Sequence, residues 1–185
     1  MPKIKITKQE IVEKSYQVFR TRGYHNTSMA IIAKECGIFK SGLYHYFSSK
    51  EELMNEVLLY VHELSKNGLF SYLRNQDLNM IERIDKFLEI LKVVHLRQTG
   101  GCIFGNIILE TASSNESFTE VIQGYFDEYK QALTSLFELK FDKAESKQLA
   151  IDWLQELEGA IMFSRLYDDN KYAEKIHKKL YKIMA

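Results

Sequence analysis

The chain has 185 residues, of which 45% are hydrophobic, and its 25 Lys or Arg residues are balanced by 25 Asp or Glu residues. This composition excludes a largely disordered chain, and the length suits one large domain or a small head with a larger body. Pro2 is the single proline, so the rest of the chain is free to form long helices. We therefore predict an all-α fold rather than a loop-rich or β-rich one.

Charge is divided unevenly along the chain. Residues 1–50 hold nine Lys or Arg against three Glu, a net charge of +6, whereas residues 51–185 hold sixteen against twenty-two acidic residues, a net charge of −6. A basic head on an acidic body is typical of a protein that contacts phosphate at one end only. The alternative is a chance imbalance of surface charge.

Other classes of protein find no support in the sequence. No secretory signal opens the chain and no stretch reaches the length of a membrane span, so we expect a cytoplasmic protein without membrane contact. The five histidines lack metal-ligand spacing, and no nucleophile triad, phosphate-binding loop or dinucleotide motif is present. We therefore expect no metal, no cofactor and no enzymatic activity.

The first predicted elements form a helical head. Thr7 and Glu10 form a capping box for a helix that ends before Gly23. A second helix carries an apolar stripe from Met29 to Cys36, and Gly37 ends it. A third short helix follows, and two helices across a glycine turn form a helix-turn-helix, which places its second helix in the major groove of DNA.

The predicted body consists of longer helices. We expect them at residues 50–73, 80–96, 103–112, 116–139 and 143–167, followed by a basic terminal helix ending at residue 184. The helices at 116–139 and 143–167 carry apolar residues on more than one face, which favours burial against a second subunit. Gly159 and Ala160 would permit close approach there. The alternative is that all these residues serve one monomeric core.

Residues 27–53 resemble the amino-terminal domain of TetR-family transcriptional regulators. The matching positions are Thr27, Ser28, Ile32, Ala33, Gly37, Leu43, Tyr44, Tyr46, Phe47, Ser49, Lys50, Glu51 and Leu53. The resemblance implies a three-helix DNA-binding head at residues 1–49 and a helical domain for ligand binding and dimerisation at residues 50–185. It further implies a homodimeric repressor that a small organic effector releases from a near-palindromic double-stranded DNA operator.

Candidate DNA contacts come from the predicted helix-turn-helix. Short polar or basic side chains near the start of the recognition helix reach base edges, and flanking donors bind phosphate. Base-edge or groove contacts are predicted for Lys40, Ser41 and His45, with Gly42 between them, and phosphate contacts for Thr27, Ser28, Tyr44 and Lys50. Two residues depart from the family pattern. Ile31 replaces the usual acidic residue, and Phe39 replaces the usual Ser or Thr cap, so Phe39 is expected to leave the cap weaker or to contact a thymine methyl.

Candidate effector contacts lie in the predicted body and are mostly aromatic. The pocket residues that we predict are Phe87, Cys102, Phe104, Asn106, Phe126, Tyr129, Trp153 and Phe163. The segment from Gly101 to Asn106 resembles the Gly-Cys-x-x-Gly-Asn segment of one TetR subgroup. Cys102 would begin a helix, where the macrodipole favours a reactive thiolate, so a thiol sensor of electrophiles or oxidants is one alternative. Alternatively, Cys102 and the aromatic residues serve only to pack the core. A second alternative function is a protein-interaction module or activator on the same scaffold.

Overall fold

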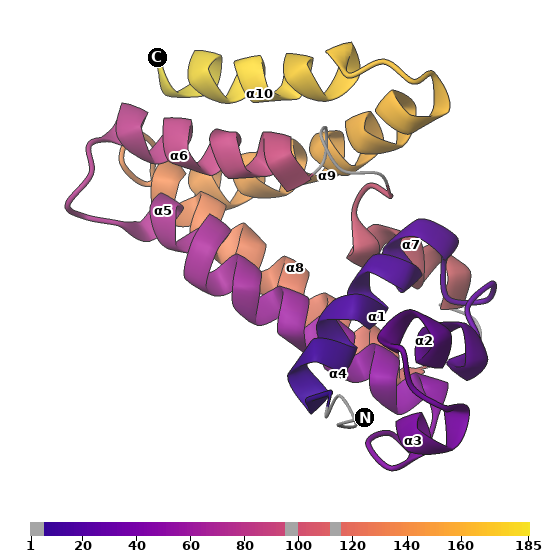
Figure 1. Cartoon of the computed structure of the whole chain (residues 1–185). Coiled ribbons are helices and arrows are strands. Elements are labelled where there is room, and N and C mark those ends of the chain that lie inside the picture. The colour runs from indigo at the N-terminus through magenta and orange to yellow at the C-terminus, as the bar shows by residue number, and fades with distance from the viewer. Residues whose placement is uncertain (1–5, 95–99, 112–115) are drawn as a thin grey trace. The chain divides into compact units, whose positions relative to one another are not determined.

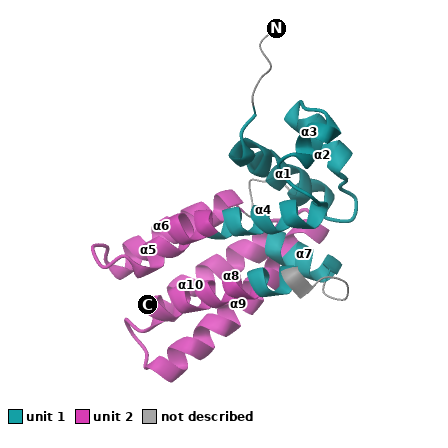
Figure 2. Cartoon of the chain, turned by 90° about the horizontal axis from the view of Figure 1, so that it is seen from below, with its two compact units in different colours: residues 1–62, 103–122 teal, residues 63–102, 123–185 magenta. Residues whose placement is uncertain are grey.

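Every regular element in the described part of this computed structural model, residues 6–94, 100–111 and 116–185, is a helix (Figure 1). The prediction of an all-α fold is therefore confirmed. The chain forms two compact units (Figure 2). We call residues 1–62 and 103–122 the head unit, and residues 63–102 and 123–185 the body unit. Within the described residues, no helix is both long and apolar enough to cross a membrane.

The head unit is built around the predicted helix-turn-helix. Its elements are α1 (Lys8–Arg22), α2 (Met29–Cys36), α3 (Lys40–Tyr44), the part of α4 (Lys50–Ser65) up to His62, α7 (Ile103–Thr111) and the start of α8 (Glu116–Phe137). α2 packs against both α1 and α3. Thr7 and Glu10 form the predicted capping box of α1, and Gly37 ends α2 in the left-handed conformation, with φ of 71°. Both helix boundaries were thus set by local chemistry.

The body unit holds the remaining helices. They are the last residues of α4, a π-helix (η1, Lys66–Phe70), α5 (Ser71–Arg74), α6 (Met80–Lys92), most of α8, α9 (Lys143–Leu166) and α10 (Lys171–Met184). α10 packs along α9 and also contacts α6. Trp153 anchors this packing, because its ring lies 5.8 Å from that of Phe87 and its Nε1–H donates to the Ile176 carbonyl at 3.1 Å.

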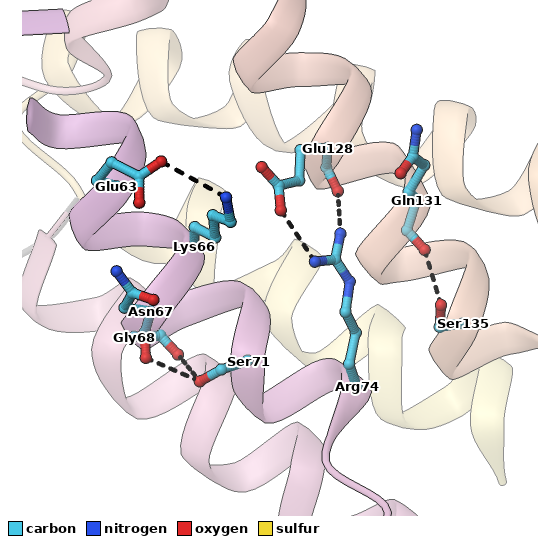
Figure 3. A network of polar contacts seen from close by, with 9 residues as sticks. All are labelled: Glu63, Lys66, Asn67, Gly68, Ser71, Arg74, Glu128, Gln131 and Ser135. Carbon is cyan, nitrogen blue, oxygen red and sulfur yellow. Dashed lines mark hydrogen bonds and ion pairs between the residues drawn. The ribbon is translucent and has the colours of Figure 1, made fainter. Parts of the chain in front are cut away.

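The predicted helix at 50–73 is interrupted by the π-helix. A π-helix shifts the backbone hydrogen-bond pattern by one residue, so carbonyl groups beside it need other donors. Ser71 supplies one, since its hydroxyl donates to the carbonyls of Asn67 and Gly68 at 3.0 and 2.8 Å (Figure 3). Arg74 then ties this segment to α8, donating to the carboxylate and the backbone carbonyl of Glu128 at 2.9 and 3.1 Å (Figure 3).

Several helix starts differ in detail from the prediction. Asn79 and Glu82 form a capping box that begins α6 and that the sequence analysis overlooked. The Asp142 side chain caps α9 by accepting from the backbone N–H groups of Ala144 and Glu145, whereas the Asn170 side chain makes no cap hydrogen bond at α10. There Asp169 accepts the backbone N–H of Lys171 at 2.9 Å instead. The predicted ends at 96 and 112 lie outside the described residues.

The two compact units do not follow the predicted domain boundary after residue 49. α7 lies about fifty residues beyond that boundary in the sequence, yet it belongs to the head unit. The same unit also takes α4 as far as residue 62. The boundary after residue 49 therefore stays a prediction about function, while the compact head is made of two separate stretches of chain.

Candidate functional site

The helix α3, predicted to be the recognition helix, is held by an apolar anchor and presents polar side chains outward. Leu43 within it and Phe47 just after it are buried, with exposed fractions of 0% and 1%. Lys40 and Tyr44 are exposed on its other side, with the ammonium of Lys40 5.7 Å from the centre of the Tyr44 ring. The structure thus brings together the predicted base-reading side chains, which include Ser41 and His45 as further exposed residues.

Phe39 and Gly42 give this helix two unusual features. Phe39 stands at the N-cap, makes no cap hydrogen bond through its side chain and is 86% exposed. The expected loss of the cap is therefore confirmed. Gly42 has room for a methyl group, because a Cβ built there would lie 3.9 Å from the nearest side-chain atom, Cβ of Ile38. Packing within the chain does not explain why a glycine stands at this position.

Two of the predicted phosphate contacts are engaged inside the head unit. Thr27 is 2% exposed, and its hydroxyl donates to the Gly23 carbonyl at 2.7 Å. Lys50 donates to the carbonyls of Tyr24 and Thr27 at 2.9 and 3.0 Å, with its ammonium 4.0 Å from the centre of the Tyr24 ring. Burial lowers the pKa of Lys50. In this conformation the hydrogen bonds of both side chains hold the turn before α2, and their predicted phosphate contacts stay predictions.

Ser28 is exposed, like the polar residues of α3, but it also makes a hydrogen bond within the head unit. Its hydroxyl accepts the backbone N–H of Ile31 at 3.3 Å as the N-cap of α2. The hydroxyl hydrogen of a serine cap stays available to an acceptor such as a phosphate oxygen. Its predicted phosphate contact is compatible with the structure and stays a prediction.

Glu110 on α7 is a residue of the head unit that the sequence analysis missed. One of its carboxylate oxygens accepts the backbone N–H groups of both Tyr24 and His25, at 2.8 and 3.1 Å. The His25 ring also contacts the Glu110 carbonyl at 2.9 Å through Nε2. This carboxylate fixes the turn that leads into the helix-turn-helix. Since 86 residues separate Glu110 from Tyr24, no local sequence pattern signals the contact.

The predicted effector residues are divided between the two units. Phe104 and Asn106 belong to the head unit, whereas the other six predicted pocket residues belong to the body unit. Phe163, whose effector contact stays a prediction, is not a core residue. This ring is 41% exposed near the end of α9, and it packs against Tyr167 and Tyr172 at centroid distances of 5.9 and 5.6 Å. Its position on the outward side of α9 takes it away from the interior.

A buried polar cluster in the body unit combines predicted and overlooked residues. Cys102 is 6% exposed and its thiol donates a hydrogen bond to the carboxylate of Glu158 on α9. Burial raises the pKa of Glu158 to about 7. Burial also raises the pKa values of Tyr125 and Tyr129 on α8, and the charge of Glu158 contributes to both increases. Cys102 and Tyr129 were predicted from the sequence, whereas Glu158 was not, because its neighbours in the sequence carry no motif.

Two family models account for most of the chain. The model of bacterial regulatory proteins of the tetR family matches residues 11–57. The model of the C-terminal domain of LmrA/YxaF-like transcriptional regulators matches residues 81–179, which is more than half of the chain. The chain belongs to the TetR family. It is a DNA-binding transcriptional regulator, and α3 in its head unit is the recognition helix of the family.

Relatives of this TetR-family regulator match over most of its length. The HTH-type transcriptional regulator YxaF of Bacillus subtilis is 27% identical over 162 residues, covering 85% of this chain and 84% of YxaF. IcaR of Staphylococcus aureus, the negative transcriptional regulator of the biofilm operon icaADBC, is 27% identical over 144 residues, covering 69% of this chain and 73% of IcaR. A crystal structure of a TetR transcriptional regulator from Legionella pneumophila shares the fold, with a TM-score of 0.88, 23% identity and 98% of each chain covered.

Proposed function

We propose that this TetR-family regulator is a dimeric repressor that a small organic effector releases from a near-palindromic operator. The observation that carries the proposal is the exposed polar face of α3, held in place by the buried Leu43 and Phe47. The description of IcaR as a negative regulator supports repression. We also propose that the chain belongs to the TetR subgroup that carries a Gly-Cys-x-x-Gly-Asn segment, which residues 101–106 resemble.

Dimerisation is supported by the surface at the end of α9. Met162, Leu166 and Tyr167 are exposed there, with 55%, 68% and 58% of their surfaces accessible. Apolar side chains gathered on one helix end favour contact with a second protein surface, because burying them removes apolar area from water. Two copies of the chain joined by this region would present two α3 helices to a near-palindromic operator.

Release of DNA requires that the effector bind two conformations with unequal affinity. The chain provides a short covalent route for such a signal, because Cys102 of the polar cluster directly precedes α7. α7 in turn carries Glu110, whose carboxylate holds the backbone of Tyr24 and His25 before α2. A displacement of α7 would therefore alter the support of the helix-turn-helix. The linking helix that begins at Lys50 provides a second route.

Operator binding is tested by selection from random duplex DNA at two salt concentrations. We expect a palindromic motif and an affinity that falls steeply with salt, because bound Lys and Arg release counterions from phosphate. Lys40→Ala and Tyr44→Phe should weaken binding to the selected operator. Lys147→Ala, which removes an exposed lysine of the body unit, is the matched control and should leave binding unchanged. Sequence-independent binding that ignores Lys40 and Tyr44 would overturn the proposal and favour a protein-interaction module, for which the exposed Phe39 would be the contact.

The thiol-sensor alternative is tested at Cys102. A reactive cysteine needs an accessible sulfur and a nearby positive charge, whereas Cys102 is buried and donates to a carboxylate. We therefore expect Cys102→Ser to retain effector-induced release of DNA. Loss of the response in this variant, with operator binding intact, would favour the thiol sensor.

A further inference from the structure

The Glu158 carboxyl group lies in surroundings that disfavour its charge. Within the described residues its hydrogen-bond donor is the Cys102 thiol, a weak donor, and no cation is among the groups that act on its pKa. Removing an ionised carboxylate from water costs free energy unless a positive charge or strong donors compensate. Glu158 nevertheless keeps part of its surface accessible, so it is not sealed in the core. The ionised form of Glu158 therefore has no positive charge to match it among the groups that act on its pKa, and a bound cation would supply one.

Tyr125 and Tyr129 on α8, whose pKa values the charge of Glu158 raises, belong to a cluster of aromatic rings. The Phe70 ring lies 4.8 Å from Tyr129 and 5.5 Å from Tyr125, and Phe87 lies 6.1 Å from Tyr129. The faces of such rings attract cations, most strongly where water is excluded. The Tyr129 hydroxyl is buried and has no hydrogen-bond partner in the described part of the chain. A phenol oxygen has acceptor lone pairs, so a positive group beside it is favoured.

The chemistry of the cluster therefore selects the charge of the ligand. An anion would be repelled by the Glu158 carboxylate, and a neutral apolar molecule would leave the negative charge of that carboxylate unmatched and the Tyr129 hydroxyl unpaired. A metal ion has little support, because no group of three or more His, Cys, Asp or Glu side chains in the described residues is placed to hold one. An organic cation satisfies both the carboxylate and the rings.

We propose that the effector is an organic cation with an apolar or aromatic body, whose positive group pairs with Glu158 between Cys102, Tyr125 and Tyr129. This inference rests on the proposed function as an effector-controlled repressor and specifies the chemical class of the effector. Glu158 is the residue that discriminates by charge. The rings of Phe70, Tyr125 and Tyr129 contribute the apolar and cation–π contacts.

The binding test compares two molecules of the same shape, phenyltrimethylammonium and its neutral isostere tert-butylbenzene. Trp153 is the single tryptophan of the chain and packs against Phe87, so its fluorescence reports events in the body unit. Calorimetry supplies an independent affinity. We expect the full-length protein to bind the cation at least about tenfold more tightly than the isostere.

Glu158→Gln keeps the size of the side chain and removes its charge. The preference for the cation should disappear in this variant, while binding of the isostere should stay unchanged. Glu174→Gln, which neutralises an exposed carboxylate on α10, is the matched control and should keep the full preference. Equal binding of both molecules by the natural chain, or a preserved preference in Glu158→Gln, would overturn the inference. So would the absence of saturable cation binding at millimolar concentration.

A measurement on the natural chain needs no variant. The groups facing Glu158 are Cys102 before α7 and Tyr125 and Tyr129 on α8, and burial raises the pKa values of both tyrosines well above neutral pH. Glu158 is thus the group expected to titrate, with a pKa of about 7. Lowering the pH from one unit above this value to one unit below should weaken cation binding about tenfold and leave the isostere unaffected. A pH-independent preference would contradict the role of Glu158.

These measurements use no DNA, so they separate this inference from the proposed function. If the operator is bound and released by other compounds but the cation does not bind, only the identity of the effector class fails. If the protein binds no operator, the repressor proposal fails, while the charge preference is still measured directly.

Discussion

Phe39 combines an energetic cost with a large exposed ring at the start of the recognition helix. A serine at an N-cap accepts a backbone N–H that phenylalanine leaves unpaired, so Phe39→Ser should raise the stability of the head by about 1 kcal/mol. If the ring contacts a thymine methyl, the same substitution should remove selectivity at one base pair of the operator. Thermal unfolding measures the first effect.

The second effect is measured with operators in which single thymines are replaced by uracil, which lacks the methyl group. We expect the natural chain to lose affinity at one such position and the Phe39→Ser variant to be indifferent to it. Equal sensitivity of both proteins at every position would contradict a thymine contact by Phe39.

His177 makes the stability of the body unit depend on pH. The side chain is 3% exposed, neither ring nitrogen has a hydrogen-bond partner within the described residues, and burial lowers its pKa from 6.5 to about 4. Because the folded pKa lies below the unfolded one, unfolding takes up a proton below pH 6.5. Stability should therefore fall as the pH drops, by at most about 1.4 kcal/mol per pH unit until the folded pKa is reached.

His177→Leu replaces the titrating ring with an apolar side chain of similar size. Urea unfolding over this pH range should show a smaller loss of stability in the variant than in the natural chain. Identical slopes for the two proteins would exclude His177 as the source of the pH dependence.

At the scale of elements, α7 is expected to stabilise the head through Glu110. Glu110→Ala leaves two backbone N–H groups without their acceptor and should lower the stability of the head unit by about 1–3 kcal/mol. Glu110→Gln keeps one acceptor oxygen and should have an intermediate effect. Hydrogen exchange at the amides of Tyr24 and His25 provides the specific readout. Glu120→Ala, at an exposed residue of the same unit, should change neither amide, and an unchanged exchange rate in Glu110→Ala would disprove the link.

The elements that sequence predicts well are those fixed by neighbouring residues. The cap at Thr7 and Glu10 and the left-handed Gly37 depend on contacts within four residues, so their signals are local. Glu110 and Glu158 act across long separations, and the sequence offers no pattern that pairs them with Tyr24 or Cys102. The π-helix at 66–70 was also missed, because the apolar spacing on either side of it is compatible with one uninterrupted helix.

The candidate sites show the same division. Periodicity identified the exposed side of α3 correctly, because Leu43 and Phe47 mark the buried side. Six of the eight predicted effector residues were chosen for being aromatic, a property shared by buried and exposed residues alike. Trp153 consequently proved to be a core residue and Phe163 an exposed one, at 1% and 41% of their surfaces. The spacing of apolar residues predicts that a helix has an apolar side, but it does not identify the element or subunit that covers this side.

At the scale of the whole molecule, Gly159 tests the proposed dimer. A Cβ built at Gly159 has no neighbour within 4 Å in the described residues of the protomer, so Gly159→Ala should stabilise α9 by about 0.5–1 kcal/mol. If α9 approaches a second copy closely at this position, the added methyl group should weaken the dimer. Sedimentation velocity measures the dimer dissociation constant.

Gly68→Ala is the matched control, because a Cβ at Gly68 is equally unobstructed and Gly68 lies in the π-helix instead. This variant should leave dimerisation unchanged. Undisturbed dimerisation in Gly159→Ala would place the interface elsewhere on the protein.

The head unit consists of two separate stretches of the chain, and this limits how its DNA-binding part can be exchanged with that of another regulator. Engineers who build hybrid repressors usually want to exchange a DNA-reading part at a single junction. A junction after residue 49 would separate α7 from the turn at residues 23–25 and leave the amides of Tyr24 and His25 without the Glu110 carboxylate. A transplant that carries residues 103–122 along with residues 1–62 preserves that support, so the transferable module is discontinuous in the gene although it is continuous in space.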